Sequence, residues 1–357
     1  MNQPNLGAPQ PDPTPAGPTP AQPGPAQPAP AQPGQQPAYA PSRGPQKPSP
    51  LPTEPQDFLR FYRSPRWAAW RGILLVITLG VGFFAILNVV VSIGIAIDLV
   101  TGRVDADSLG QTTPMLFAFN HLGSALCLPA TLLLHWAWTG QRPKWLSSVA
   151  GGFRWGRVLR ALVVALPLWI IYTLLTSLFP AAGGAGMESV EIGVHADTWF
   201  LLAVVVLVTP FQAAAEEYLF RGAGARAIGS LGPNRLVASI IAVVITSLLF
   251  CLAHGASDPW LWAYYFLFGV LMSVATWLTG GLELAVVMHA VNNLVSLAAL
   301  PFLPELTEVF DRSAGTGSPL LVLPLVCGAI TTAIVVWWQR RAGVQTSVPE
   351  VGAPATA

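Results

Sequence analysis

The stretch Phe200–Gly222, FLLAVVVLVTPFQAAAEEYLFRG, decides how this chain is interpreted, because an apolar run ends in two adjacent glutamates and an arginine. A helix needs about 20 predominantly apolar residues to cross the hydrocarbon core of a bilayer. Ionisable side chains inside such a helix cost about 2.5–3.5 kcal/mol each on insertion scales, so they are rare and usually functional. Glu216, Glu217 and Arg221 therefore mark this helix as the place to look for chemistry.

The composition of the whole chain assigns this stretch to a membrane protein. Only 10% of the 357 residues are charged and 53% are hydrophobic, whereas about a quarter of a soluble protein is charged. The apolar runs that are long enough to span a bilayer lie at roughly 72–97, 115–138, 158–179, 199–221, 236–254, 260–278, 282–303 and 319–338. They are continuous and not alternating, so we expect an all-α fold: a polytopic membrane helical bundle with about eight transmembrane helices.

The loops between these runs alternate in charge. The basic loops and flanks contain Arg142, Lys144, Arg154, Arg157, Arg226, Arg235, Arg340 and Arg341. The acidic loops contain Asp105, Asp107, Glu188, Glu191, Asp197, Asp258, Glu305, Glu308 and Asp311. By the positive-inside rule, both termini are predicted to be cytoplasmic in a multi-pass protein of the cell membrane. The net charge of +1 provides no basic field for nucleic acid, so the lipid bilayer is the expected surrounding partner.

Four regions follow from these patterns. Residues 1–56 are rich in Pro, Gln and Ala and cannot bury apolar surface, so they are predicted to be a disordered cytoplasmic tail. Residues 57–198 hold an Arg- and aromatic-rich interfacial segment, expected to meet anionic lipid, and the first three transmembrane helices. Residues 199–303 form a core of four helices that contains the polar motifs. Residues 304–357 hold the last transmembrane helix and a short cytoplasmic tail.

Helix lengths indicate whether the charged groups can meet. The strongest turn signal after Glu216 is Leu231–Asn234, so the helix can continue to about Ser230, with a kink at Pro210. Glu216 and His254 then lie about 21 Å and about 28 Å along their helices from that turn. This difference is little more than one helical turn, so both side chains can line one cavity, predicted in the cytoplasmic half of the bundle.

Residues spaced four apart place side chains on one helix face in three successive apolar segments. The three pairs are Glu217 with Arg221, Phe250 with His254, and His289 with Asn293. Each pair alone also fits a structural role: an ion pair at a helix end, a helix C-cap, or a polar clamp between helices. All three roles together require several coincidences, so a shared site is favoured.

Such a set of side chains suits hydrolysis. A carboxylate and an imidazole can share the proton of an attacking water, while a second histidine and an amide donate hydrogen bonds to the oxyanion. Alternatively, Glu216, His254 and His289 could ligate zinc with one open position. No H-E-x-x-H helix or G-x-S-x-G element is present, so the cofactor is either none or a divalent metal such as zinc.

The three segments "EEYLFR", "FCLAH" and "HAVNN" match, in order, the motifs E-E-x-x-x-R, F-x-x-x-H and H-x-x-x-N. On these motifs the chain resembles the CPBP (Abi) family, which includes the CAAX prenyl-protein endopeptidases and bacteriocin self-immunity proteins. The resemblance covers about residues 199–300. Any one motif is a weak signal, whereas the ordered triple is specific.

The resemblance implies an intramembrane endopeptidase, CAAX-endopeptidase-like and either glutamate-dependent or metal-dependent, that cuts a peptide or membrane-protein substrate near the cytoplasmic side. It implies that Glu216 and His254 activate water and that His289 and Asn293 bind the oxyanion. The implied supporting residues are Glu217, Arg221 and Phe250. The alternative function is a non-catalytic membrane scaffold or a bacteriocin self-immunity factor. Prenylation of the substrate and the oligomeric state stay open.

Overall fold

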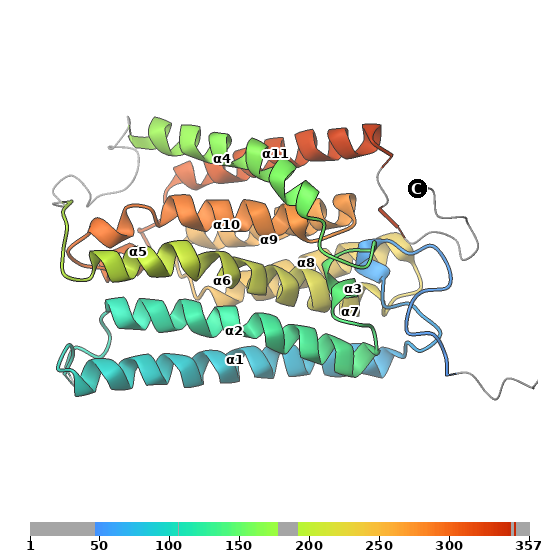
Figure 1. Cartoon of the computed structure of the whole chain (residues 1–357), viewed down its shortest axis with the longest axis horizontal. Helices are drawn as coiled ribbons and strands as arrows, with labels where there is room; N and C mark the ends of the chain where they lie inside the picture. The colour runs from blue at the N-terminus through green and yellow to red at the C-terminus, as the bar shows by residue number, and fades with distance from the viewer. Residues whose placement is uncertain (1–46, 106, 178–191, 344–345, 348–357) are drawn as a thin grey trace, which may run out of the picture. The chain divides into compact units, whose positions relative to one another are not determined.

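The computed structural model describes residues 47–105, 107–177, 192–343 and 346–347, and all helices named below belong to the compact unit of residues 48–357 (Figure 1). The helices are α1 (Ala69–Val100), α2 (Pro114–Thr139), α3 (Lys144–Ser147), α4 (Trp155–Ser177), α5 (Thr198–Leu207), α6 (Thr209–Glu216), the π-helical η4 (Glu217–Gly224), α7 (Ala225–Gly229), α8 (Arg235–Ala253), α9 (Pro259–Thr279), α10 (Glu283–Ser296) and α11 (Val322–Arg341). Short 3₁₀ turns are η1 (Phe58–Arg60), η5 (Leu300–Phe302), η6 (Glu308–Phe310) and η7 (Pro319–Leu321). Residues 1–46 of the predicted tail, and Glu188 and Glu191, lie outside the described residues.

The described residues contain eight helical segments that are long and apolar enough to cross a membrane. They are Ala69–Val100, Pro114–Thr139, Trp155–Thr176, Thr198–Gly229, Arg235–Ala253, Pro259–Thr279, Glu283–Phe302 and Pro319–Arg341. Each coincides with one of the predicted runs, and no strand occurs within the described part of the chain. The predicted all-α membrane bundle is therefore confirmed, with helix ends shifted by a few residues.

The ends of several helices follow from capping chemistry. Thr113 and Asp258 accept hydrogen bonds from backbone N–H groups in the first turns of α2 and α9, and Asn234 does so for α8. Gly140 and Gly280 end α2 and α9 in the left-handed region, with φ of 74° and 66°, a conformation that costs glycine nothing. These caps set where each span begins and ends.

The long span Thr198–Gly229 is continuous past Glu216, as the turn signals predicted. It divides at Val208, directly before the Thr209-Pro210 start of α6, because proline cannot donate the hydrogen bond that would continue α5. The eight residues after Glu216 are π-helical, which the sequence patterns did not predict. Stretches of π-helix are rare and occur frequently at functional sites.

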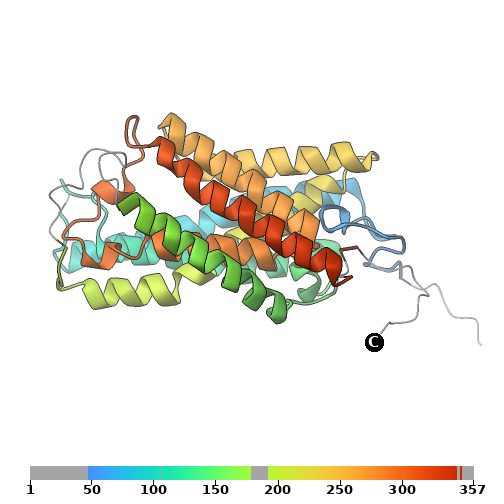
Figure 2. The same cartoon turned by 90° about the horizontal axis from the view of Figure 1, so that it is seen from above.

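This span lies in the interior of the bundle. In Figure 1, α6 runs between α2 on one side and α10 on the other, and residue contacts join α6 to both. The η4 segment packs against α1, α2 and α8, while α10 also contacts α4 and α9. Seen from above in Figure 2, α4 and α11 lie side by side over this layer, and residue contacts join them. Polar groups on α6 and η4 are consequently enclosed by other helices.

The segment Phe58–Tyr62, predicted to be interfacial, is buried against the bundle. Arg60 and Arg63 do not extend to lipid but donate hydrogen bonds to the carbonyl of Gly232, over 3.2 and 2.6 Å, at the turn between α7 and α8. The aromatic residues Phe58, Phe61 and Tyr62 are thus removed from water by the protein interior, and the two arginines satisfy a carbonyl of the turn after α7. Contact of the wider segment with anionic lipid stays a prediction.

The first and last described parts of the compact unit lie at the same end. Asp57 forms an isolated antiparallel bridge with Ser347. An even number of spans returns the chain to the side on which it started, so this bridge agrees with the count of eight. The cytoplasmic location of that end stays a prediction.

Candidate active site

Glu217 is the centre of a fully buried charge network. Its Oε1 accepts hydrogen bonds from Arg221 Nη1 over 3.1 Å and from His289 Nδ1 over 2.7 Å. The side chains of Glu217 and Arg221 are 0% exposed, so the ion pair expected from their spacing is present and has no contact with water. The guanidinium also lies 4.2 Å from the ring centre of Phe250, which stabilises its charge through a cation–π contact.

Glu216 has a different environment, although it is the adjacent residue. Its Oε1 accepts a hydrogen bond of 2.5 Å from Gln212 Nε2, one turn earlier on α6. Its Oε2 has no hydrogen-bond partner in the described structure and lies 3.6 Å from His289 Nε2. Glu217 Oε2 also has no hydrogen-bond partner in the described structure, but Glu217 is paired with the Arg221 cation, whereas Glu216 has no arginine partner and its Oε2 faces an imidazole nitrogen.

His289 bridges the two glutamates. The Glu217 carboxylate fixes the Nδ1 side of the ring, and this contact turns Nε2 toward Glu216. The imidazole ring also makes edge-on contacts with Phe250 and Phe268, at centroid distances of 5.9 and 5.1 Å, and these contacts restrict its rotation. A carboxylate that orients an imidazole in this way is a common support of catalytic and ligating histidines.

Hydrogen-bonded side-chain amides extend the site along α10. Asn293 Nδ2 donates a hydrogen bond of 3.0 Å to Gln212 Oε1, so Asn293 holds the glutamine that in turn holds Glu216. Asn292 donates to Asn293 Oδ1, and its own Oδ1 accepts hydrogen bonds from Trp169 and Tyr264 on two neighbouring helices. The predicted residue Asn293 therefore lies in the same network as Glu216.

His254 lies at the end of α8, where it is the C-cap residue. Its Nδ1 lies 2.8 Å from the carbonyl oxygen of Phe250, which can only accept, so Nδ1 carries the proton and Nε2 is left to act as a base. The ring stacks on Tyr265 with a centroid distance of 4.0 Å. No hydrogen bond or ion pair joins His254 to Glu216 in the described structure, and Phe250 contacts both His254 and His289.

Gln212 and Asn292 are site residues that the motifs did not single out. Gln212 is the only amide in the run TPFQAAAE and lies four residues before Glu216, a spacing that puts both side chains on one helix face. Asn292 precedes Asn293, and its partners come from α4 and α9. The spacing could have identified Gln212, whereas the partners of Asn292 depend on tertiary packing.

The donor set does not fit a metal centre in this arrangement. Within the described residues, no group of three or more His, Cys, Asp or Glu side chains is arranged to hold a metal ion. His289 Nε2 lies 3.6 Å from Glu216 Oε2, whereas no hydrogen bond or ion pair in the described structure brings His254 to either of them. The zinc set of Glu216, His254 and His289 is not assembled here, and the chemistry below uses the side chains alone.

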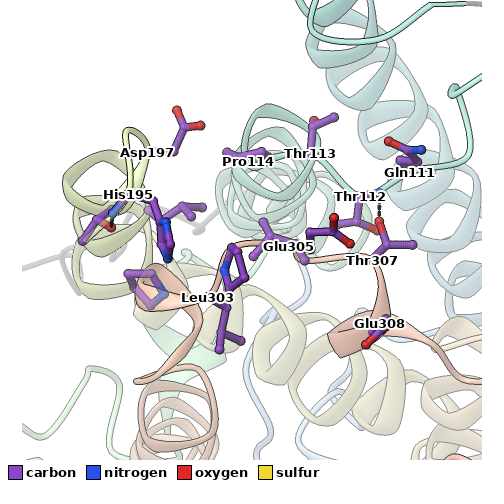
Figure 3. A pocket seen from close by; sticks show the side chains of 15 residues that line it. Gln111, Thr112, Thr113, Pro114, His195, Asp197, Leu303, Glu305, Thr307 and Glu308 are labelled. Carbon is purple, nitrogen blue, oxygen red and sulfur yellow. Dashed lines mark hydrogen bonds between the residues drawn. The ribbon is translucent and has the colours of Figure 1, made fainter. Parts of the chain in front are cut away.

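A hollow of about 450 Å³ lies at the end of the bundle away from α7, and none of the predicted site residues lines it (Figure 3). The side chains around it come from the loops before α2, α5 and η6 and include Gln111, Thr113, His195, Asp197, Glu305 and Glu308. Two of these loops are joined by a hydrogen bond of 3.1 Å from Thr112 N to Thr307 Oγ1. The polar network around Glu216 is separate from this hollow.

Comparison with known proteins identifies the segment that carries the network. Residues 197–295 match the family model "Type II CAAX prenyl endopeptidase Rce1-like". A curated relative, the uncharacterized protein YyaK of Bacillus subtilis (strain 168), is 26% identical over 152 residues, which are 40% of this chain and 50% of that protein. The chain thus spans about half the length of the curated relative, and no solved structure gives a significant match. The matched segment contains all three motifs and is similar to the CPBP family, as those motifs predicted, and the eight apolar helices make the chain a multi-pass membrane protein.

Proposed function

We propose that this protein is an intramembrane endopeptidase that hydrolyses a peptide bond with water activated by Glu216. The observation that carries the proposal is the contrast between the adjacent glutamates. Glu217 is neutralised by Arg221 and orients His289, whereas Glu216 has no arginine partner and its Oε2, which accepts no hydrogen bond from the described residues, lies 3.6 Å from His289 Nε2. The match to the type II CAAX prenyl endopeptidase family supports the same reaction class.

The charges of the network favour this chemistry. Arg221 and Glu217 form a buried ion pair, so their charges cancel inside the network. An unbalanced charge in a low-dielectric interior would cost several kcal/mol, so a paired carboxylate is stable where a single carboxylate is not. Glu217 is therefore suited to hold Arg221 and His289 in place, which leaves Glu216 as the carboxylate that exchanges a proton.

In the proposed reaction, Glu216 Oε2 accepts the proton of a water as its oxygen attacks the carbonyl carbon of the substrate. The resulting oxyanion accepts a hydrogen bond from the second N–H of Asn293, for which the described residues offer no acceptor, and His289 Nε2 faces the same oxyanion site. The proton that Glu216 took from water then passes to the leaving amine, with His254 Nε2 as the relay, so that a carboxylic acid and an amine are released. Water supplies all added atoms, and the donors are held by neighbours before the substrate arrives.

The substrate is proposed to be a peptide or a membrane-protein segment, cut near the membrane surface at which the catalytic network is accessible. A lipidated cysteine would place such a peptide at the bilayer, as the name of the matched family suggests. The bilayer contributes to substrate recognition as well, because it concentrates apolar substrates beside the helices.

Glu216→Gln tests the function, because it removes the charge and keeps the shape of the side chain. Membrane fractions from cells that contain wild-type or variant protein are compared for newly formed peptide ends by mass spectrometry. We expect wild-type-dependent ends that fall at least about 100-fold in the variant, the size of a lost general base. Glu305→Gln, an equal change in a loop at the end of the bundle, is the control and should retain them. Equal cleavage by the Glu216 variant refutes the mechanism, and a scaffold would retain its cellular effect in both variants.

A further inference from the structure

The catalytic network is closed toward the end of the bundle that carries α7. Behind Glu217, the side chains of Arg221 and Arg226 are 0% exposed, and Phe58 covers the second guanidinium at 3.8 Å. On the opposite side of the network, His254 and Asn293 are partly exposed. Figure 1 shows that this opposite direction leads along α5 and α10 toward the loop that joins α10 to α11. A substrate therefore has to reach Glu216 past that loop or from the membrane beside it.

Arg312 in this loop lies directly beside His254. Its Nη1 donates a hydrogen bond of 3.4 Å to the carbonyl oxygen of His254, and its guanidinium lies 5.9 Å from the ring centre of Tyr265, which stacks on the same histidine. The backbone carbonyl of Arg312 accepts hydrogen bonds from Ser257 N over 2.9 Å and from Asp258 N over 3.3 Å. The loop is thus tied to the connection between α8 and α9, and Arg312 has a defined place at the edge of the network.

The charge of Arg312 has no carboxylate partner among the described residues. Two acids beside Arg312 are already engaged: Asp258, whose N–H contacts the Arg312 carbonyl, accepts from the backbone N–H groups of the first turn of α9 and of Gly315, and the adjacent Asp311 accepts from Ser313 N. Arg312 instead lies beside the His254 carbonyl and the ring of Tyr265. A half-buried cation without a carboxylate partner attracts an anion.

We propose that Arg312 is a specificity-determining residue that binds a carboxylate of the substrate next to the scissile bond. A guanidinium offers a planar pair of N–H donors that matches a carboxylate, and burial between Tyr265 and the loop strengthens the contact. The inference rests on the proposed peptidase function and makes the substrate class more specific: peptides with a free C-terminal carboxylate or an acidic side chain near the cut. A C-terminal carboxylate and an acidic side chain bind a guanidinium by the same chemistry, and the experiment below distinguishes the two.

The test uses three S-farnesylated heptapeptides that share one sequence: a free acid, its C-terminal amide, and an amide that ends in glutamate. Binding is measured by fluorescence anisotropy to full-length protein in nanodiscs, with Glu216→Gln as the uncleaving background. Cleavage is measured as kcat and KM with Glu216 intact. The variants are Arg312→Gln and Arg312→Lys, and the control is Arg103→Gln, which removes an arginine at the same end that is paired with Asp197.

We expect the free acid, or the glutamate amide, to bind at least tenfold more tightly than the plain amide. Arg312→Gln should remove this preference by weakening acid binding about 10- to 100-fold, as for a lost charge-assisted hydrogen bond. Arg312→Lys should keep part of the preference, the amide should bind equally to all variants, and kcat should change little. Arg103→Gln should behave as the parent protein.

Two results overturn the inference. The first is the absence of any preference for acid over amide, and the second is a loss on Arg312→Gln that is equal for acid and amide, which marks a purely structural role. A carboxylate preference that depends on Arg312 in a protein that cleaves none of the peptides supports the inference and contradicts the peptidase mechanism. The preference of acid over glutamate amide, or the reverse, identifies which carboxylate is bound.

Discussion

Replacement of Glu217 by glutamine provides the strictest test of the charge network. The variant keeps an oxygen that accepts from His289 Nδ1, so the hydrogen bond of 2.7 Å can persist. What it removes is the negative charge beside Arg221, whose side chain is 0% exposed and whose ion pair with Glu217 is 3.1 Å long. Two further guanidinium nitrogens, Nε and Nη2, have no hydrogen-bond partner in the described structure. Arg221 would then remain as a buried cation with little compensation.

The expected loss in free energy of unfolding is about 3–5 kcal/mol, the usual effect of removing one partner of a buried ion pair. The cation–π contact of 4.2 Å with Phe250 offsets part of this loss, so the lower part of the range is expected. The same change at Glu216 should cost less than about 1 kcal/mol or be stabilising, because a buried carboxylate without an arginine partner is removed. Two isosteric substitutions at adjacent positions should therefore have different effects on stability.

Unfolding by sodium dodecyl sulfate in mixed micelles, followed by circular dichroism, measures both changes. The double variant Glu217→Leu with Arg221→Met serves as a further control, since replacing a buried ion pair by apolar side chains is often neutral or stabilising. It should recover most of the stability that Glu217→Gln loses. Equal stability of the Glu216 and Glu217 glutamine variants would refute the reasoning, because the network would then not depend on the ion pair.

Three further substitutions test parts of the fold that support the site. Gly229→Ala would place a Cβ at 2.5 Å from the backbone oxygen of Leu59, so it should destabilise the protein by about 1–3 kcal/mol and release the N-terminal segment to protease. Asn292→Ala removes the acceptor of Trp169 Nε1, 3.1 Å away, and should cost about 1–3 kcal/mol together with a shift in tryptophan emission. Tyr62→Phe leaves a buried histidine nitrogen without its hydroxyl partner at 2.8 Å, with an expected loss of about 1–2 kcal/mol in the same unfolding assay.

Matched controls distinguish these effects from general damage. A Cβ at Gly156, which is helical, meets nothing within 4 Å, so Gly156→Ala should be neutral or slightly stabilising. Asn88→Ala removes an amide that bonds only within its own helix, to Phe84 O over 2.7 Å, and should change stability by less than about 0.5 kcal/mol. If Gly156→Ala destabilises the protein as much as Gly229→Ala, or Asn88→Ala as much as Asn292→Ala, the assigned contact does not explain the loss of stability.

The fold class follows from the order of residues along the chain, since burial in lipid requires long apolar runs with internally satisfied backbones. The positions of the eight spans, the break before Pro210 and the turn before Arg235 were all predictable for that reason. The pairing of Glu217 with Arg221 was predictable as well, because four residues form about one helical turn.

The tertiary structure alone decided which imidazole meets which carboxylate. The sequence favoured Glu216 with His254, but His289 lies between the glutamates because α10 packs directly against α6, and His254 belongs to the edge near Arg312. Side-chain spacing reports neighbours on one helix and contains no information on which helices pack together. The same limit applies to the N-terminal aromatics Phe58, Phe61 and Tyr62, which are buried against the bundle. Composition shows that such residues leave water, and only the packed helices determine whether lipid or protein receives them.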